Sequence, residues 1–145
     1  MEIKTLKLKE GAKLPYKATE GSAGADLFAC IDEPMTVKPG EIVFIPTGIA
    51  VEIPKGYGGF MFPRSSIACK NGISFPNGVG VIDSDYRGEI SAVLINHSQN
   101  SYTVNHGDRV AQMVIMPVEN AEYTLANELS DTKRGEGGFG STGKN

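Results

Sequence analysis

The densest group of residues that could do chemistry runs NGVGVIDSDYRGE, residues 77–89. Asp83 follows an apolar run that predicts a strand, so its carboxylate stands at a strand end, where it could accept a proton from water. Tyr86 offers a flat aromatic face three residues later, and Gly80 would let a planar ring approach the backbone closely. The same letters are equally typical of a β-turn before Gly88, with Asp83 as a turn former. Within this segment alone, both interpretations stay open.

Three other short segments each place a polar group among apolar or small residues. In PRSSIA, Arg64 could hold two phosphate oxygens in a bidentate fork, and Ser65 could begin a short helix whose free N–H groups face an anion. In GDRVAQM, Gln112 interrupts an apolar strand pattern, so it either faces solvent or is a placed hydrogen-bonding group. In SAGADL, Asp26 precedes an apolar run. Each of these segments alone is also typical of an ordinary turn or strand.

The sequence shows no convincing pair of nucleophile and base. A Ser–Lys motif of the SxxK type ending at Lys70 would need serine at position 67, which is Ile67. The segment GVGVID lacks the third glycine of a dinucleotide fingerprint. The segment that begins DSDYRG opens like a calcium-binding loop. Its fifth and twelfth positions, which supply oxygen ligands in such loops, are Arg87 and Leu94. Direct attack by an activated water is therefore the simplest chemistry for this chain.

The elements that position these residues are predicted to be short strands. Eighteen glycines and eight prolines punctuate runs rich in Val, Ile, Phe and Tyr, which is typical of a closed or sandwiched all-β architecture. One short helical turn, with a serine at its start, is expected at 65–71. The expected strands are 2–8, 41–45, 49–53, 59–62, 79–82, 89–95, 101–104 and 109–116.

The C-terminal stretch SDTKRGEGGFGSTGKN differs from the rest of the chain. Its glycine-rich composition cannot build a core, so residues 130–145 are expected to form a mobile segment. Residues 1–129 are expected to form a single domain. Arg134 and Phe139 could nevertheless supply a cation and a stacking face, and the glycines would let backbone N–H groups approach an anion. Such a segment could order on a ligand as a lid.

Composition excludes several classes of function. A chain of 145 residues fits one domain, and its net charge of -3 with no basic stripe argues against a nucleic-acid binder. No apolar run approaches the length of a membrane span, and the N-terminus lacks a signal peptide. Cys30 and Cys69 have no CxxC spacing, so we expect two buried thiols in a reducing compartment, and a cytoplasmic protein.

Taken together and in order, five segments closely resemble the motifs of the homotrimeric deoxyuridine triphosphatase (dUTPase) family: AGADL, PRSS, GVIDSDYRGE, GDRVAQ and RGEGGFGSTG. One departure is Ser66, where the second motif of that family usually has glycine. Serine there is similar to the related deoxycytidine triphosphate deaminases, so a deaminase or bifunctional enzyme of the same fold is the main alternative. The glutamate that those enzymes use is matched here by Arg87, which argues against deamination. A non-enzymatic module of the fold, or an unrelated β-sandwich, would leave the five intact motifs unexplained.

The resemblance implies a jelly-roll-like fold of the β-clip type and a homotrimer whose three active sites are each built from all three chains. It implies hydrolysis of dUTP to dUMP and pyrophosphate with Mg²⁺, which limits uracil in DNA and supplies dUMP for thymidylate synthesis. Asp83 would deprotonate the water that attacks the α-phosphorus, and Asp26 would meet Mg²⁺ through water, the ion being otherwise bound by the substrate phosphates. The resemblance assigns uracil and deoxyribose to Asn77, Gly80, Val81, Tyr86 and Phe139, and the phosphates to Arg64, Ser65, Ser66, Gln112, Arg134, Gly140 and Ser141.

Overall fold

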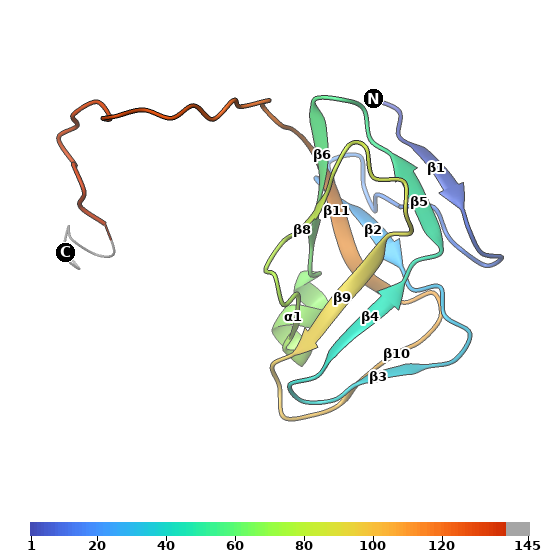
Figure 1. Cartoon of the computed structure of the whole chain (residues 1–145). Helices are drawn as coiled ribbons and strands as arrows, with labels where there is room; N and C mark the ends of the chain where they lie inside the picture. Colours follow the sequence, from blue (N-terminus) through green and yellow to red (C-terminus); the bar gives the residue numbers. More distant parts are fainter. Residues whose placement is uncertain (139–145) are drawn as a thin grey trace.

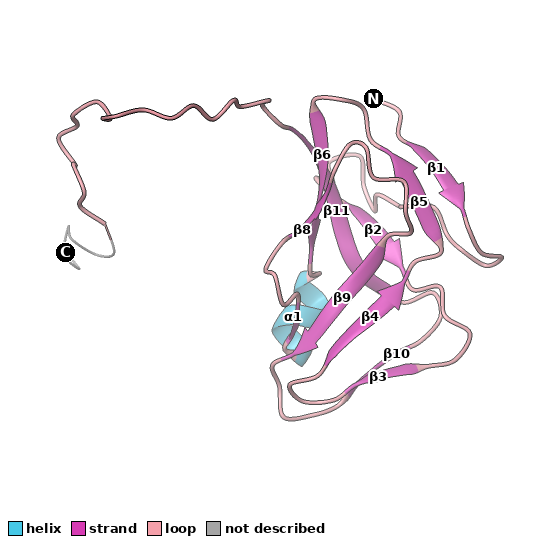
Figure 2. Ribbon diagram, in the orientation of Figure 1, coloured by secondary structure: helices cyan, strands magenta, loops and turns pink. Residues whose placement is uncertain are grey.

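The computed structural model describes residues 1–138, and residues 139–145 lie outside the described part. The described chain forms short strands and one short helix, so the predicted all-β fold is confirmed (Figure 1 and Figure 2). The elements are β1 (Lys4–Lys7), β2 (Ala25–Phe28), β3 (Met35–Val37), β4 (Ile42–Pro46), β5 (Ile49–Glu52), β6 (Tyr57–Phe62), α1 (Ser65–Asn71), β7 (Ile73–Ser74), β8 (Gly80–Ile82), β9 (Ser91–Asn96), β10 (Tyr102–Val104) and β11 (Arg109–Pro117).

The strands form four small antiparallel sheets. The largest has the order β2-β11-β6-β8, and a second has the order β4-β9-β7. Two strand pairs, β1-β5 and β3-β10, complete the set. Because consecutive strands often belong to different sheets, residues far apart in the sequence meet on one sheet.

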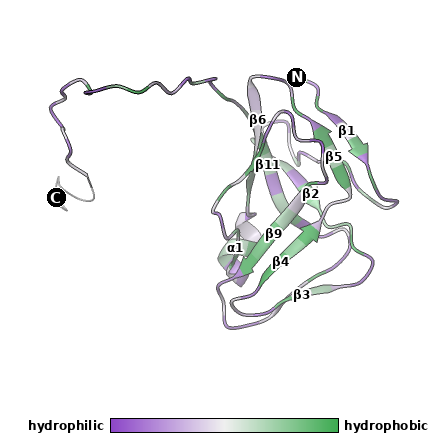
Figure 3. Ribbon diagram, viewed as in Figure 1, coloured by the Kyte–Doolittle hydropathy of each residue, from purple (hydrophilic) through white to green (hydrophobic). Residues whose placement is uncertain are grey.

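A single hydrophobic core lies between the sheets. Side chains that alternate along the strands fill it, as on β9, where Ala92, Leu94 and Asn96 point inward. Asn96 is the polar exception, and its Nδ2 donates to the Val37 and Asn100 carbonyls at 2.8 Å each. The hydropathy colouring of Figure 3 places the most apolar ribbon on β4, β5 and β9.

The helix α1 covers the predicted residues 65–71, but Ser65 does not cap it. Arg64 occupies the N-cap position, and no side chain there accepts from the helix N–H groups. At the other end, Gly72 adopts the left-handed region with φ 67°, and its N–H donates to the Ala68 carbonyl. Glycine suits this position because a side chain in that region is strained.

Three strands were not predicted: β2, β3 and β7. Each has at most four residues, which makes a period-2 pattern weak in the sequence, although the equally short β8 and β10 were predicted. Asp26 lies within β2 itself, with the apolar run after it forming the rest of the strand and the segment that follows. Cys69 is exposed on α1, so the expectation of two buried thiols is correct only for Cys30.

The chain leaves the domain after β11. Residues 118–138 contain no helix or strand and run away from the sheets in Figure 1. Tyr123, Leu125 and Leu129 are 96%, 101% and 89% exposed, so these apolar side chains touch almost nothing in their own chain. Within the described residues, no helix has the length and apolar character needed to cross a membrane.

Candidate functional site

Four of the five motif segments meet on the sheet β2-β11-β6-β8. Asp26 on β2 lies opposite Gln112 on β11, and Gln112 lies opposite Phe62 on the other side. Phe62 ends β6, so the chain reaches Arg64 two residues later. The first, second and fourth motifs are thus brought together by strand register.

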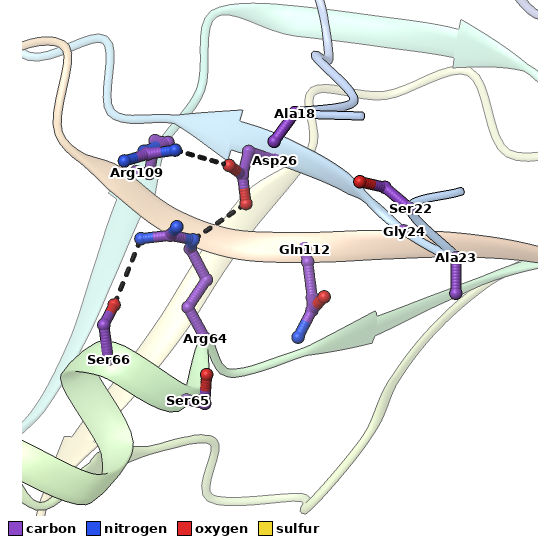
Figure 4. Close-up of a pocket in the computed structure, with 10 residues that line it drawn as sticks. All are labelled: Ala18, Ser22, Ala23, Gly24, Asp26, Arg64, Ser65, Ser66, Arg109 and Gln112. Carbon is purple, nitrogen blue, oxygen red and sulfur yellow. Dashed lines mark hydrogen bonds and ion pairs between the residues drawn. The ribbon is translucent and has the colours of Figure 1, made fainter. Parts of the chain in front are cut away.

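These three motifs enclose a pocket of about 290 Å³, shown in Figure 4, which we call the Asp26 pocket. Small residues and polar groups line it, with almost no large apolar side chain. The lining residues are Ala18, Ser22, Ala23, Gly24, Asp26, Arg64, Ser65, Ser66, Arg109 and Gln112.

Asp26 holds two guanidinium groups in this pocket. Arg64 Nε donates to Asp26 Oδ1 at 2.7 Å, and an Arg109 terminal nitrogen donates to Asp26 Oδ2 at 3.1 Å. The carboxylate side chain is only 13% exposed, whereas the Arg64 and Arg109 side chains are 21% and 45% exposed. A second Arg64 nitrogen donates to Ser66 Oγ at 3.2 Å, so Arg64 is fixed at two of its nitrogens.

Arg109 is the charged lining residue that was not predicted from the sequence. It is three residues from Gln112, and such spacing in a regular strand places two side chains on opposite faces. The register shifts between Arg109 and Ala111, where Arg109 pairs with Phe28 but Ala111 already pairs with Leu27. This β-bulge turns Arg109 to the face of Gln112 and Asp26, and such a shift has no clear signal in the sequence.

Gln112 and Ser65 complete the polar lining. Gln112 Nε2 approaches the Pro63 carbonyl at 3.4 Å, so this side chain is a placed hydrogen-bonding group and not a solvent-facing one. A Cβ on Gly24 would come within 3.2 Å of Gln112 Oε1, so the glycine leaves room for the amide. Ser65 lies exposed beside Ser66 at the start of α1.

Asp83 stands directly after β8, as predicted, and it begins a β-turn. The Tyr86 N–H donates to the Asp83 carbonyl at 3.2 Å, and Tyr86 Oη donates to the Glu89 carbonyl at 3.0 Å. The turn therefore fixes both residues through backbone contacts. The Asp83 carboxylate is exposed, and no hydrogen bond or ion pair to it is found within residues 1–138.

Asp83 does not line the Asp26 pocket. It lines a separate pocket of about 1000 Å³, which we call the Asp83 pocket, together with Val81, Arg87 and residues of β6 and the 118–120 segment. Ile82 pairs with Gly59, whereas Arg64 follows the opposite end of β6. The two pockets are therefore separated along β6. From Gly59 to Phe62 the strand spans roughly 10 Å at about 3.3 Å per residue, and Arg64 follows two residues beyond Phe62.

The other residues predicted to contact the base lie around β8. Asn77 is exposed in the turn before the strand, and Val81 is 60% exposed. Gly80 pairs with Met61, and a Cβ on Gly80 would lie 3.1 Å from the Met61 Cβ. The absence of a side chain at Gly80 therefore serves the packing of β8 on β6.

The tail residues are not joined to either pocket within the described chain. Arg134 is exposed in the segment that runs away from the sheets, and its Nε donates to the Gly137 carbonyl at 2.7 Å. Phe139, Gly140 and Ser141 lie outside the described residues.

The described residues contain no group of three His, Cys, Asp or Glu side chains that could hold a metal ion. Asp26 is the one carboxylate of its pocket, and both of its oxygens already accept from arginines. Each carboxylate oxygen has a second lone pair, so a metal-bound water could still donate to it. The donor set thus fits a Mg²⁺ ion held chiefly by a ligand, with contact to Asp26 through water.

One titratable group near this region has a shifted pKa. Burial, and secondarily the Asp108 carboxylate, raise the pKa of Tyr102 above 10.0, and the Arg64 guanidinium partly opposes this. The phenol of Tyr102 therefore stays protonated at neutral pH and serves the packing of β10.

Comparisons with known proteins agree on one family. The family model described as dUTPase matches residues 10–143. The chain is 51% identical over 144 residues to the deoxyuridine 5'-triphosphate nucleotidohydrolase of Desulfitobacterium hafniense (strain DSM 10664 / DCB-2), covering 99% of this chain and 95% of that protein. It is 49% identical to the protein of the same name from Hydrogenobaculum sp. (strain Y04AAS1), covering 99% of each.

Solved structures show the same fold. The dUTPase of Staphylococcus bacteriophage 80alpha with dUPNHPP superposes with a TM-score of 0.89 at 29% identity, covering 98% of each chain. A dUTPase from phage phi11 of S. aureus, described with a structural Mg(II) ion, superposes with a TM-score of 0.79 at 26% identity, covering 88% of this chain and 98% of that one.

Proposed function

The chain belongs to the dUTPase family and hydrolyses dUTP, and we propose that Asp83 supplies the general base for this reaction. The Asp83 carboxylate takes a proton from a water molecule as the water oxygen bonds to the α-phosphorus. The bond from the α-phosphorus to the bridging oxygen breaks, so the products are dUMP and pyrophosphate. The exposed carboxylate after β8, fixed through its own turn, is the observation that supports this role.

The base and the sugar would be read by the residues around β8. In this proposal, Asn77 and the backbone of Gly80 and Val81 contact uracil, and Tyr86 packs on the deoxyribose. Support comes from the exposure of Asn77 and Val81 and from the hydrogen bond that fixes Tyr86 Oη.

The phosphates would enter the Asp26 pocket. Arg64, Ser65, Ser66 and Gln112 present cationic and polar groups there, which suit phosphate oxygens. A Mg²⁺ ion bound by the substrate phosphates would neutralise part of their charge, with Asp26 accepting from one of its waters. The phage phi11 relative, with its structural Mg(II) ion, supports the choice of metal.

We propose further that each active site is shared between chains of a homotrimer. Within one chain the Asp83 and Asp26 pockets lie toward opposite ends of β6, so one triphosphate would have difficulty reaching both. A second chain that brings its Asp26 pocket to the first chain's Asp83 removes this difficulty. The apolar side chains exposed on the 118–129 segment, Tyr123 among them, are consistent with packing on another copy.

The C-terminal segment 130–145 would close over this shared site. Arg134, Gly140 and Ser141 would contact the γ-phosphate and Phe139 would stack on uracil. The course of residues 118–138, away from their own domain, supports delivery of this segment to a neighbouring chain. A closing segment would also exclude water from the reaction.

The test is pyrophosphate release with Mg²⁺ from dUTP, UTP, dTTP and dCTP, with the Asp83→Asn variant in parallel. We expect rapid release from dUTP alone, and a kcat about 10²- to 10⁴-fold lower in the variant, because a general base contributes that much. Binding of dUTP should persist in the variant, since the amide keeps the carboxylate's shape. Near-normal turnover by Asp83→Asn would refute the role of Asp83, and ammonia release from dCTP would favour the deaminase alternative.

A further inference from the structure

Arg109 and Asp26 together carry an inference that rests on the proposed function and extends it. We propose that Arg109 is a second phosphate-binding arginine, and that Asp26 acts as a positioning residue that orients Arg64 and Arg109 around one phosphate group. The structural support has three independent parts: strand register, charge and free hydrogen-bond donors.

The first part is the β-bulge at the start of β11. Without the register shift between Arg109 and Ala111, Arg109 and Gln112 would face opposite sides of the sheet. The shift places Arg109 opposite Phe28, on the same face as Asp26 two residues earlier on β2. A bulge interrupts the ladder, and its structural result here is to aim one arginine into the Asp26 pocket.

The second part is the charge of the pocket. Asp26 is the one carboxylate among the lining residues, and it is shared by two guanidinium groups that stay protonated in proteins. One positive charge is therefore left without a partner among the residues that line the pocket. Two guanidinium groups this close repel each other, and an anion between them would relieve the repulsion.

The third part is the set of donors that remain free. Arg109 uses one terminal nitrogen on Asp26, and within residues 1–138 no other hydrogen bond of its side chain is found. Its side chain is 45% exposed, so Nε and the other terminal nitrogen can reach a ligand. Arg64 likewise spends one N–H on Asp26 and one on Ser66, which leaves a terminal nitrogen free. Figure 4 shows the three side chains as one connected row, Arg109–Asp26–Arg64.

The experiment measures binding, so it does not depend on turnover. The variant Arg109→Gln is titrated with the imido analogue of dUTP, with inorganic tripolyphosphate, and with deoxyuridine, which has no phosphate. Because a hydrogen bond to a charged group contributes about 1.5–3 kcal/mol, we expect the Kd of both phosphate ligands to rise by about 10- to 100-fold. The Kd of deoxyuridine should change less than about twofold, because the nucleoside has no phosphate for the guanidinium to bind.

Two further variants sharpen the result. Arg109→Lys keeps the charge but loses the planar fork, so its Kd for the phosphate ligands should lie between those of wild type and Arg109→Gln. This variant also carries the test if Arg109→Gln does not fold. Lys38→Gln removes one positive charge from an exposed residue directly after β3, outside the sheet that carries the pocket, and it should bind all three ligands like wild type.

The outcomes separate this inference from the proposed function. Unchanged binding of tripolyphosphate and the imido analogue by Arg109→Gln would overturn it, as would an equal loss for deoxyuridine, which indicates a distorted fold. Wild-type protein that binds tripolyphosphate through Arg109 but releases no pyrophosphate from dUTP would refute the proposed function and leave the phosphate-binding role of Arg109 intact.

Discussion

Asp26 and Asp83 are suited to different tasks because their neighbours differ. Asp26 lies between two guanidinium groups and is largely buried, so each of its oxygens already accepts from an arginine. Asp83 is exposed at the end of β8, and no hydrogen bond to its carboxylate is found in the described chain. A free carboxylate can accept a proton from water, whereas one that holds two arginines is better suited to positioning. The contacts of the two aspartates therefore support different proposed roles, general base for Asp83 and orienting group for Asp26.

Ser66 offers a prediction at the scale of a single residue. Its Oγ accepts from Arg64 at 3.2 Å and Ser66 lines the Asp26 pocket, at the position where the resemblance leads one to expect glycine. Replacing it in Ser66→Gly should raise the KM for dUTP by about two- to tenfold, since a hydrogen bond of this kind contributes roughly 0.5–1.5 kcal/mol. Steady-state kinetics provide the measurement. Ser66→Ala is the matched control, because it removes the same hydroxyl without adding backbone freedom; a KM that is unchanged in both variants would contradict the role.

Short elements position these side chains. The helix α1 is only two turns long. It lies between β6, which ends at Phe62, and β7, which begins at Ile73, so these two strands set its position. Arg64 precedes it and Gly72 ends it, so the geometry of Arg64, Ser65 and Ser66 depends on a helix too short to be stable alone. The bulge in β11 has a comparable effect, because one extra residue decides which face Arg109 occupies.

Gly72→Ala tests the helix end. Its φ of 67° is unfavourable for alanine by about 1–2 kcal/mol, so the free energy of unfolding should fall by at least that amount. A Cβ there would also lie 3.0 Å from the Ser98 Cβ, which adds a steric cost. Urea unfolding at a fixed protein concentration measures the change. Gly40→Ala is the control, because Gly40 has φ 74° but nothing within 4 Å of the added Cβ; equal losses in both variants would show that the Ser98 contact is unimportant.

At the scale of the whole molecule, the separation of the two pockets is the central feature. Register places Asp83 near one end of β6 and Arg64 beyond the other end. The pairing of β6 with β8 therefore keeps the two groups apart within one chain. A site shared between copies resolves this separation, and closed symmetric oligomers are the usual form of such sharing.

Mixed oligomers test the shared site directly. Asp83→Asn and Arg64→Gln subunits should each be nearly inactive alone. If Asp83 and Arg64 of one site come from different chains, unfolding and refolding the two variants together should restore activity to about a quarter of the wild-type sites, since random mixing gives each site one chance in four of two intact residues. Pyrophosphate release before and after mixing is the measurement, with sedimentation to establish the oligomer. Activity that stays absent in correctly assembled mixed oligomers would indicate that each site lies within one chain.

The sequence by itself determined the fold class, the long strands, the helix at 65–71 and the position of Asp83 after a strand. These features depend on local composition and periodicity, which are readable over a few residues. The short strands β2, β3 and β7 were missed because their patterns are too brief, and only long-range pairing stabilises them.

Only the tertiary structure decided which motifs share a pocket. The pairing of β2 with β11 and of β11 with β6 joins Asp26, Gln112 and Arg64, which are far apart in the sequence. The bulge that adds Arg109 to them is a property of strand register, which no single segment encodes. The distance between Asp83 and this group follows from the antiparallel pairing of β8 with β6, and it is the physical reason for proposing that a second chain completes the site.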